Sequence, residues 1–286
     1  MRLSCLLVVF LFISKSAFAF TEITTQIHEV DIGTRPGDEV LVLLKTGDVA
    51  RLNISDLDKI DELQSYAFNE GWFTITLDEK RFIKRIVSAE SPVVSTEEKQ
   101  SFYDMSYTPT TIASMEIATE YIKEARSRVE REGTTQCFNR AMVWSYEWWK
   151  RHSLRSMKMF IFWPKEYIRK YSFKWWFHVT PYVHVMDADG VVKERALDVK
   201  WINRPYSMQD WADFHSTKDV KCRVVEKYSD YANNPFYTDR CYFMRANMYT
   251  WQPADLEMNE AWGYSKDAFN MDEVRAAFLE AFNVNL

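Results

Sequence analysis

Cys137, His178 and Asp198 together have the chemistry of a nucleophile, a base and an orienting acid. We expect Cys137 to lie in the first turn of a helix, where unpaired backbone N–H groups and the positive end of the helix dipole stabilise a thiolate. The same N–H groups would bind the oxyanion of a tetrahedral intermediate. This placement predicts nucleophilic catalysis by a thiol with a lowered pKa, and the alternative is a buried, inert thiol.

Of the five histidines, His178 is the one for which the sequence predicts a carboxylate partner. Residues 187–190 predict a hairpin turn, and folding the chain about this turn brings Asp198 close to His178, whereas His184 would face residues 193–195. An aspartate there would hold the imidazole in one tautomer, although a half-buried histidine beside an incidental aspartate remains the alternative. The other histidines are expected to be solvated: His28, His152 and His215.

Hydrophobic spacing predicts the helices around these residues. An amphipathic helix is predicted over residues 111–132, ended by Gly133, and the helix that carries Cys137 follows it at once. Thr134 or Thr135 is the expected N-cap of that second helix. Near the end of the chain, Asn270 and Glu273 match a capping box and predict a closing helix.

Strand patterns predict an α+β protein with a small β-rich domain before the catalytic region. Extended segments around His178 are predicted over residues 157–163, 175–186 and 191–199. The β-rich domain is predicted within residues 20–105, with strands at 39–44, 49–52, 72–77 and 81–87 and one helix at 55–68 that Ser55 would cap. Residues 88–110, which contain Ser, Thr, Pro and acidic residues, are predicted to be a linker before the catalytic domain, residues 111–286.

The first 19 residues predict a secretory signal peptide, with an apolar stretch over residues 3–13 and a small-x-small cleavage signature, Ala17-Phe18-Ala19. Ser14, Lys15 and Ser16 interrupt the apolar stretch well before the roughly 18 residues that a membrane span needs. We therefore expect a secreted or periplasmic protein that has no stable membrane anchor and begins, when mature, at Phe20.

The charge distribution and the cysteine content further limit the functions that this sequence can have. Residues 20–105 contain 17 acidic and 9 basic residues, a balance of −8, whereas residues 106–286 contain 24 acidic and 25 basic residues, a balance of +1. No basic field suited to nucleic acid is present. Of the three cysteines that follow the signal peptide, Cys222 and Cys241 are predicted to pair in an oxidising compartment, which leaves Cys137 free.

Four short blocks, taken in order, resemble the signature of bacterial protein glutaminases. They are Cys137-Phe138-Asn139-Arg140-Ala141, Trp176-Phe177-His178-Val179, Leu197-Asp198, and Pro205 followed by Ser207 and Trp211. The Cys137 to His178 separation of 41 residues and the His178 to Asp198 separation of 20 also resemble the family. The sequence departs from the family where Val199 and Lys200 follow the aspartate in place of Pro and Ser, and at Pro181.

The resemblance implies a papain-like or transglutaminase-like core, in which a nucleophile helix packs on an antiparallel sheet. It implies Cys137 as nucleophile, His178 as acid and base, and Asp198 as orienter, in a deamidase that converts glutamine side chains of proteins or peptides to glutamate and ammonia. A thioester intermediate is implied, and no metal or organic cofactor. Tryptophans that would wall the substrate groove, unless they are core residues, are Trp175, Trp176, Trp201 and Trp211.

Other functions fit the same residues. A transglutaminase would pass the acyl group to lysine and give cross-linked products, and a cysteine peptidase would give fragments. A non-catalytic peptide-binding or glycan-binding module would leave Cys137 unreactive. We expect a monomer whose N-terminal region, similar in position and size to the pro-segments of glutaminases, is either an inhibitory cap or a permanently attached accessory domain.

Overall fold

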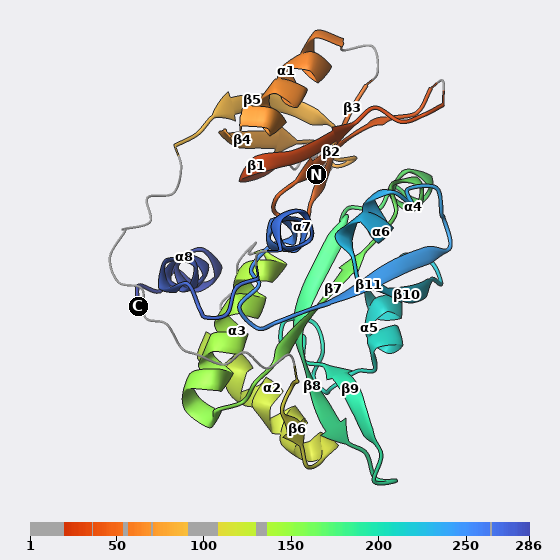
Figure 1. Ribbon diagram of the computed structural model, residues 1–286. Helices are drawn as coiled ribbons and strands as arrows, with labels where there is room; N and C mark the ends of the chain where they lie inside the picture. Colours follow the sequence, from red (N-terminus) through yellow and green to blue (C-terminus); the bar gives the residue numbers. More distant parts are fainter. Residues whose placement is uncertain are drawn as a thin grey trace, which may run out of the picture.

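The computed structural model describes residues 20–35, 37–53, 57–69, 71–90, 108–129, 136–263 and 265–286. The predicted signal peptide, most of the predicted linker and the predicted caps Ser55 and Gly133 lie outside these residues. Within them the chain is an α+β protein, as predicted, and a β-rich N-terminal region precedes the larger sheet (Figure 1). We call residues 20–90 the N-terminal unit and residues 108–286 the C-terminal unit. None of the described helices is long and apolar enough to cross a membrane.

The N-terminal unit is an antiparallel sheet in the order β3-β2-β1-β4-β5, with helix α1 against one face (Figure 1). Its elements are β1 (Thr21–Asp31), β2 (Val40–Leu44), β3 (Val49–Leu52), α1 (Leu57–Asn69), β4 (Trp72–Leu77) and β5 (Ile83–Ser88). The sequence pattern does not predict the central strand β1, because its apolar residues Ile23, Ile27 and Val30 do not alternate. A register shift between Ile27 and Glu29 accounts for this irregular spacing.

Strand β2 is buried on both faces. Val42 and its alternate neighbours belong to the core beneath α1, whereas Leu41 and Leu43 belong to the same buried cluster as the core of the C-terminal unit. A strand covered on both sides carries a continuous apolar run instead of an alternating one. The N-terminal unit is therefore attached to the rest of the molecule through a hydrophobic interface.

Ion pairs border this interface. Glu29 pairs with Lys165, and Asp31 pairs with Arg169, so that acidic residues of the N-terminal unit meet basic residues of the C-terminal unit. Arg51, which is 2% exposed, reaches across to donate a hydrogen bond to the carbonyl oxygen of Ile168. The two units thus share both apolar and charged contacts.

The C-terminal unit is built on a six-stranded sheet in the order β10-β11-β7-β8-β6, with β9 paired to β8. The strands are β6 (Thr111–Ile112), β7 (Met157–Phe162), β8 (Phe177–Met186), β9 (Val192–Ala196), β10 (Lys221–Val225) and β11 (Arg240–Ala246). The strands β11, β7, β8 and β9 are antiparallel, as predicted for the core sheet, and the edge strands β10 and β6 add one parallel pair each, to β11 and β8. The predicted Cys222–Cys241 disulfide is present and joins two paired residues of β10 and β11.

Seven helices of the C-terminal unit are described: α2 (Met115–Val129), α3 (Cys137–His152), α4 (Lys165–Tyr171), α5 (Met208–His215), α6 (Tyr228–Ala232), α7 (Pro253–Trp262) and α8 (Met271–Phe282). Helix α2 begins later than predicted, because residues 111–112 form strand β6. Figure 1 shows α3 alongside the sheet, with α8 beside it. Asn270 caps α8 by accepting from the Asp272 N–H, but Glu273 pairs with Lys266 instead of completing the predicted box.

Candidate active site

Cys137 is the first residue of helix α3. The N-cap is Gln136, so the predicted cap at Thr134 or Thr135 is wrong, and the Gln136 side chain makes no capping hydrogen bond. The first backbone N–H groups of a helix have no intrahelical partner, and here no side chain of the N-cap residue occupies them. The nucleophile helix therefore begins with donors directed at the space beside the thiol.

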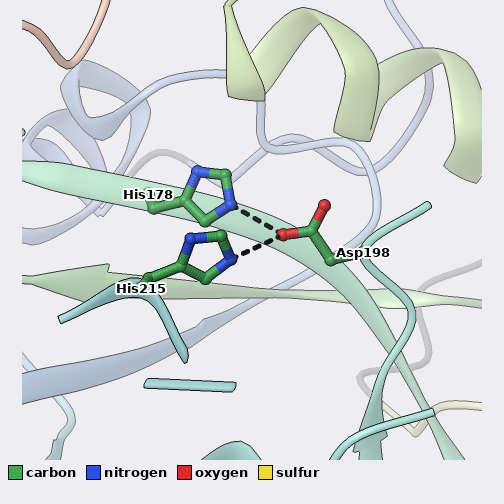
Figure 2. A group of neighbouring side chains, drawn as sticks. All are labelled: His178, Asp198 and His215. Atoms are coloured by element: carbon green, nitrogen blue, oxygen red, sulfur yellow. Dashed lines mark hydrogen bonds and ion pairs between the residues drawn. The ribbon is translucent and has the colours of Figure 1, made fainter. Parts of the chain in front are cut away.

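Strand β8 and the segment after β9 bring His178 and Asp198 together. The turn at residues 187–190 closes a hairpin, in which Tyr182 of β8 is paired with Ala196 of β9. Asp198 follows β9 and accepts a 2.7 Å hydrogen bond on Oδ2 from His178 Nε2 (Figure 2). Both side chains are buried, and the hydrogen bond leaves Nδ1 of the imidazole free to interact with another group.

His215 is a third member of this cluster, and its predicted solvation is wrong. It is the last residue of α5, is 6% exposed, and lies 3.1 Å through Nε2 from the same Oδ2 of Asp198 (Figure 2). Trp211 Nε1 donates to this oxygen as well, at 3.0 Å. Helix α5, which Ser207 caps, places Trp211 and His215 on one face, four residues apart. This spacing is the sequence signal for the contact of both side chains with Asp198.

The four tryptophans of the predicted groove fall into two pairs. Trp175 and Trp201 line the pocket that contains Cys137 and His178. Trp176 and Trp211 are buried and do not line this pocket: Trp176 donates from Nε1 to the Leu44 carbonyl, and Trp211 donates to Asp198, with its ring 5.5 Å from that of His178. The structure therefore places two of the four in the pocket lining and buries the other two beneath it or beside the histidine.

A pocket of about 220 Å³ joins the cysteine and the histidine. The turn between β2 and β3 closes one side of it. The lining residues are Thr46, Asp48, Gln136, Cys137, Arg140, Trp175, Phe177, His178, Lys200 and Trp201. Because Thr46 and Asp48 belong to the N-terminal unit, both units contribute to this pocket.

The turn between β2 and β3 is fixed to the C-terminal unit by its backbone. Trp176 N–H donates to the Gly47 carbonyl at 3.0 Å, and Val49 N–H donates to the Lys174 carbonyl at 2.8 Å. Gly47 has φ +91°, and a Cβ atom added there would lie 3.2 Å from the Phe177 carbonyl oxygen. The close approach of this turn to strand β8 therefore depends on glycine.

Burial keeps the thiol and the imidazole uncharged. It raises the pKa of Cys137 to about 12, against the opposing charge of Arg140 and a hydrogen bond from the Val179 N–H, so the predicted lowering of this pKa is wrong in the intact chain. Burial lowers the pKa of His178 to about 4. Burial alone would raise the pKa of Asp198, but His178 and His215 hold it well below its ordinary value. At neutral pH Asp198 is therefore ionised while His178 is neutral.

The same cluster has the composition of a metal site. Among the residues that the structure describes, His178, Asp198 and His215 are the group whose ligand atoms lie close enough to hold an ion, all within 4.8 Å of one another. Two imidazoles and a carboxylate suit zinc. Here, however, these atoms are engaged with one another, since both imidazoles lie within hydrogen-bond distance of Asp198 Oδ2.

Comparisons with known proteins agree with this arrangement. Residues 116–215 match a family model described as glutaminase. The chain is similar to a crystal structure of pro-protein-glutaminase at 12% identity, with a TM-score of 0.50, over 90% of this chain and 92% of that one. A mutant of pro-protein-glutaminase matches at 11% identity and a TM-score of 0.51, over 91% of this chain and 92% of that one. No curated protein sequence matches at a significant level.

At such low identity the solved structures establish the fold alone, and the family assignment comes from the matched region. That region runs from α2 to the end of α5 and contains Cys137, His178, Asp198 and His215. The fold similarity extends over both units, since it covers nine tenths of the chain. This chain therefore carries a region of the glutaminase family within the fold of a pro-protein-glutaminase.

Proposed function

We propose that this protein is an exported deamidase that hydrolyses the side-chain amide of glutamine residues in proteins or peptides, giving glutamate and ammonia. The observation that carries the proposal is a pocket shared by Cys137, at a helix N-terminus, and His178, which is hydrogen-bonded to Asp198. This combination supplies a nucleophile, a proton carrier and an orienter, and the glutaminase family match gives the substrate class.

In the proposed reaction, His178 takes the thiol proton and the Cys137 sulfur attacks the side-chain amide carbon. Backbone N–H groups at the start of α3 stabilise the oxyanion. The imidazolium then protonates the departing ammonia, which leaves a thioester on Cys137. Water activated by His178 hydrolyses this thioester to glutamate and restores the thiol. Asp198 holds the imidazole in one orientation throughout, and no metal or organic cofactor takes part.

Ammonia release from a glutamine-containing protein tests this mechanism. Cys137→Ser and His178→Ala are expected to abolish it, and Asp198→Asn is expected to leave a measurable residue, because Trp211 and His215 still pack around the cluster. Circular dichroism of each variant controls for folding. Undiminished turnover by Cys137→Ser contradicts the proposal.

The mass of the substrate separates the competing reactions. A deamidase releases ammonia and leaves the chain length unchanged, a transglutaminase produces cross-linked chains, and a peptidase produces fragments. The export proposal is tested separately by the N-terminal residue of protein recovered outside the cytoplasm. Phe20 is expected there if the segment before it is a signal peptide, in a secreted or periplasmic protein.

We further propose that the N-terminal unit covers the active site until it is removed. Support comes from the turn between β2 and β3, whose residues Thr46 and Asp48 line the pocket, and from the high pKa of Cys137 in the covered state. A buried thiol that stays protonated is a poor nucleophile. The alternative is an accessory domain that remains in place and helps to form the substrate site.

Limited proteolysis between residues 88 and 110 distinguishes these two roles. The intact chain from Phe20 to Leu286 is expected to release ammonia slowly and to label slowly with iodoacetamide at pH 6, because its thiol is protonated. Cleavage and separation of the units should speed both reactions, and adding back the N-terminal fragment should slow them. Equal activity before and after cleavage, with no inhibition by the fragment, contradicts the cover.

A further inference from the structure

The charged side chains around Cys137 give its pocket a positive balance. Arg140 and Lys200 of the C-terminal unit and Asp48 of the N-terminal unit are its charged lining residues, and His178 is neutral. Asp48 is already held within its own unit by Arg81, at 2.7 Å, and by the Thr46 hydroxyl, at 3.0 Å. Among the lining residues the two cations therefore outnumber the one carboxylate, whereas ionised Asp198, which is hydrogen-bonded to His178, is not one of the residues that line the pocket.

Lys200 is the positive charge that a ligand can reach. It is partly exposed, and no hydrogen bond or ion pair of its ammonium group is found among the described residues. It lies two residues after Asp198 and next to Trp201, which is 41% exposed. Lys200 also stands at the position where the sequence departs from the glutaminase signature. A partly exposed cation that lines a pocket can favour ligands of opposite charge.

The N-terminal unit shows that basic side chains of the C-terminal unit pair with carboxylates of another segment. Glu29 and Asp31 pair with Lys165 and Arg169, outside the pocket that contains Cys137. Within the pocket, Asp48 is the carboxylate that the N-terminal unit contributes.

We propose that this protein selects glutamine residues in acidic sequence, and that Lys200 is the specificity-determining residue that contacts a carboxylate next to the target glutamine. The choice of substrate rests on the proposed deamidase function, whereas the charge selectivity of the pocket does not. Arg140, one turn beyond Cys137 on α3, adds to the positive field but is buried, so Lys200 is the side chain that meets the neighbouring residue.

Thiol reagents of opposite charge test the pocket without any turnover. Cys137 is the one free cysteine among the described residues, since Cys222 and Cys241 form a disulfide. Cys137 in the chain from Phe20 to Leu286 is labelled with anionic sulfonatoethyl methanethiosulfonate and with cationic trimethylammonioethyl methanethiosulfonate. Each labelling rate is divided by the rate of the same reagent with a small free thiol, and the anion-to-cation ratio of these two values is taken. The ratio is expected to exceed one at low salt.

Three variants make this test specific. Lys200→Glu should lower the anion-to-cation ratio roughly tenfold, as expected for reversing one charge beside the thiol. Asp48→Asn should raise the ratio, and Lys221→Glu, on an exposed lysine of β10 outside the pocket, should leave it unchanged. An unchanged ratio in Lys200→Glu contradicts the proposal, since substituting this partly exposed lysine does not require refolding of the core.

Peptides then test the substrate class. Three peptides with one glutamine flanked by Glu, Ala or Lys are given to the chain cut between residues 88 and 110, and kcat/KM for ammonia release is measured. The Glu peptide should be preferred to the Lys peptide, and Lys200→Glu should reverse the order. Equal rates for all three peptides refute the specificity but leave the deamidase intact. If no peptide releases ammonia, the proposed deamidase function is refuted. The anion-to-cation labelling ratio then tests the charge selectivity of the pocket by itself.

Discussion

At the scale of single residues, three side chains share one carboxylate oxygen of Asp198. Its Oδ2 accepts from Trp211 and lies within hydrogen-bond distance of both His178 and His215. Each additional donor neutralises part of the charge that would otherwise stabilise the His178 imidazolium. In the proposed reaction His215 would therefore act as a positioning residue, which changes the basicity of His178 through the oxygen that both imidazoles share.

His215→Phe is expected to strengthen the interaction between His178 and Asp198 by removing one competitor. The pKa of the His178 imidazolium rises in consequence, and because the neutral imidazole is the form that takes the thiol proton, the acidic limb of the kcat/KM profile for ammonia release moves to higher pH, by roughly half a pH unit. The matched control is His215→Gln, which keeps a neutral N–H donor and should retain the original profile. A parallel loss of activity at every pH in both variants would mean that His215 only supports the fold.

At the scale of elements, strand β7 contains a buried amine that lowers the stability of the fold. Lys158 is completely buried in it, and its ammonium group donates to the Thr250 carbonyl and contacts the Met142 sulfur. Burial lowers the pKa of Lys158 from 10.5 to about 7, with a contribution from the nearby Lys266. A strand pattern rich in apolar residues predicts the position of β7, but not the burial of its lysine.

Lys158→Met is expected to raise the free energy of unfolding by roughly 2 kcal/mol at pH 7, because an apolar side chain of similar length avoids the desolvation of an amine. The unfolded chain binds one more proton than the folded chain between pH 7 and 10.5, so wild-type stability rises with pH across that window, and the variant should lose this rise. Urea unfolding at pH 7 and pH 9 measures both effects. A variant less stable than wild type at pH 7 would show that the hydrogen bond to Thr250 outweighs desolvation.

Elements with regular spacing are predictable from this sequence, and the hairpin of β8 and β9 is one of them. Its turn and alternation bring Asp198 to His178, as the sequence predicts. Strand β1 is not predictable by alternation, because its register shift breaks the period. The contact of His215 and the high pKa of Cys137 depend on tertiary burial, which the local pattern around either residue does not contain.

At the scale of the whole molecule, a histidine lies in the interface between the two units. His28 of β1 stacks on Trp176, with ring centroids 4.6 Å apart, and its Nε2 is 3.2 Å from the Tyr228 hydroxyl. Lys45, Lys165, Glu29 and Glu257 line the same cavity. Burial, aided by the two lysines, lowers the pKa of His28 to about 4.

Acid is therefore expected to weaken the attachment of the N-terminal unit. A His28 freed from the interface titrates near pH 6.5, so attachment is strongest above that pH and declines as the pH falls from 6.5 towards 4. After cleavage between residues 88 and 110, dissociation of the N-terminal fragment should be faster at pH 5 than at pH 7.5. His28→Gln, which cannot be protonated, should reduce this difference, and an equal difference in both proteins would assign it to the carboxylates Glu29 and Glu257.

The turn between β2 and β3 requires glycine at position 47, and this requirement makes it sensitive to mutation. The positive φ of Gly47 and its close approach to the Phe177 carbonyl disfavour every other residue, so the turn over Cys137 depends on a glycine codon. A single base change that replaces this glycine would loosen the turn while every group in the proposed reaction stayed intact. If the turn covers the thiol as proposed, such a mutation would release the activity before the N-terminal unit is removed, and proteins of the producing cell would be the first substrates.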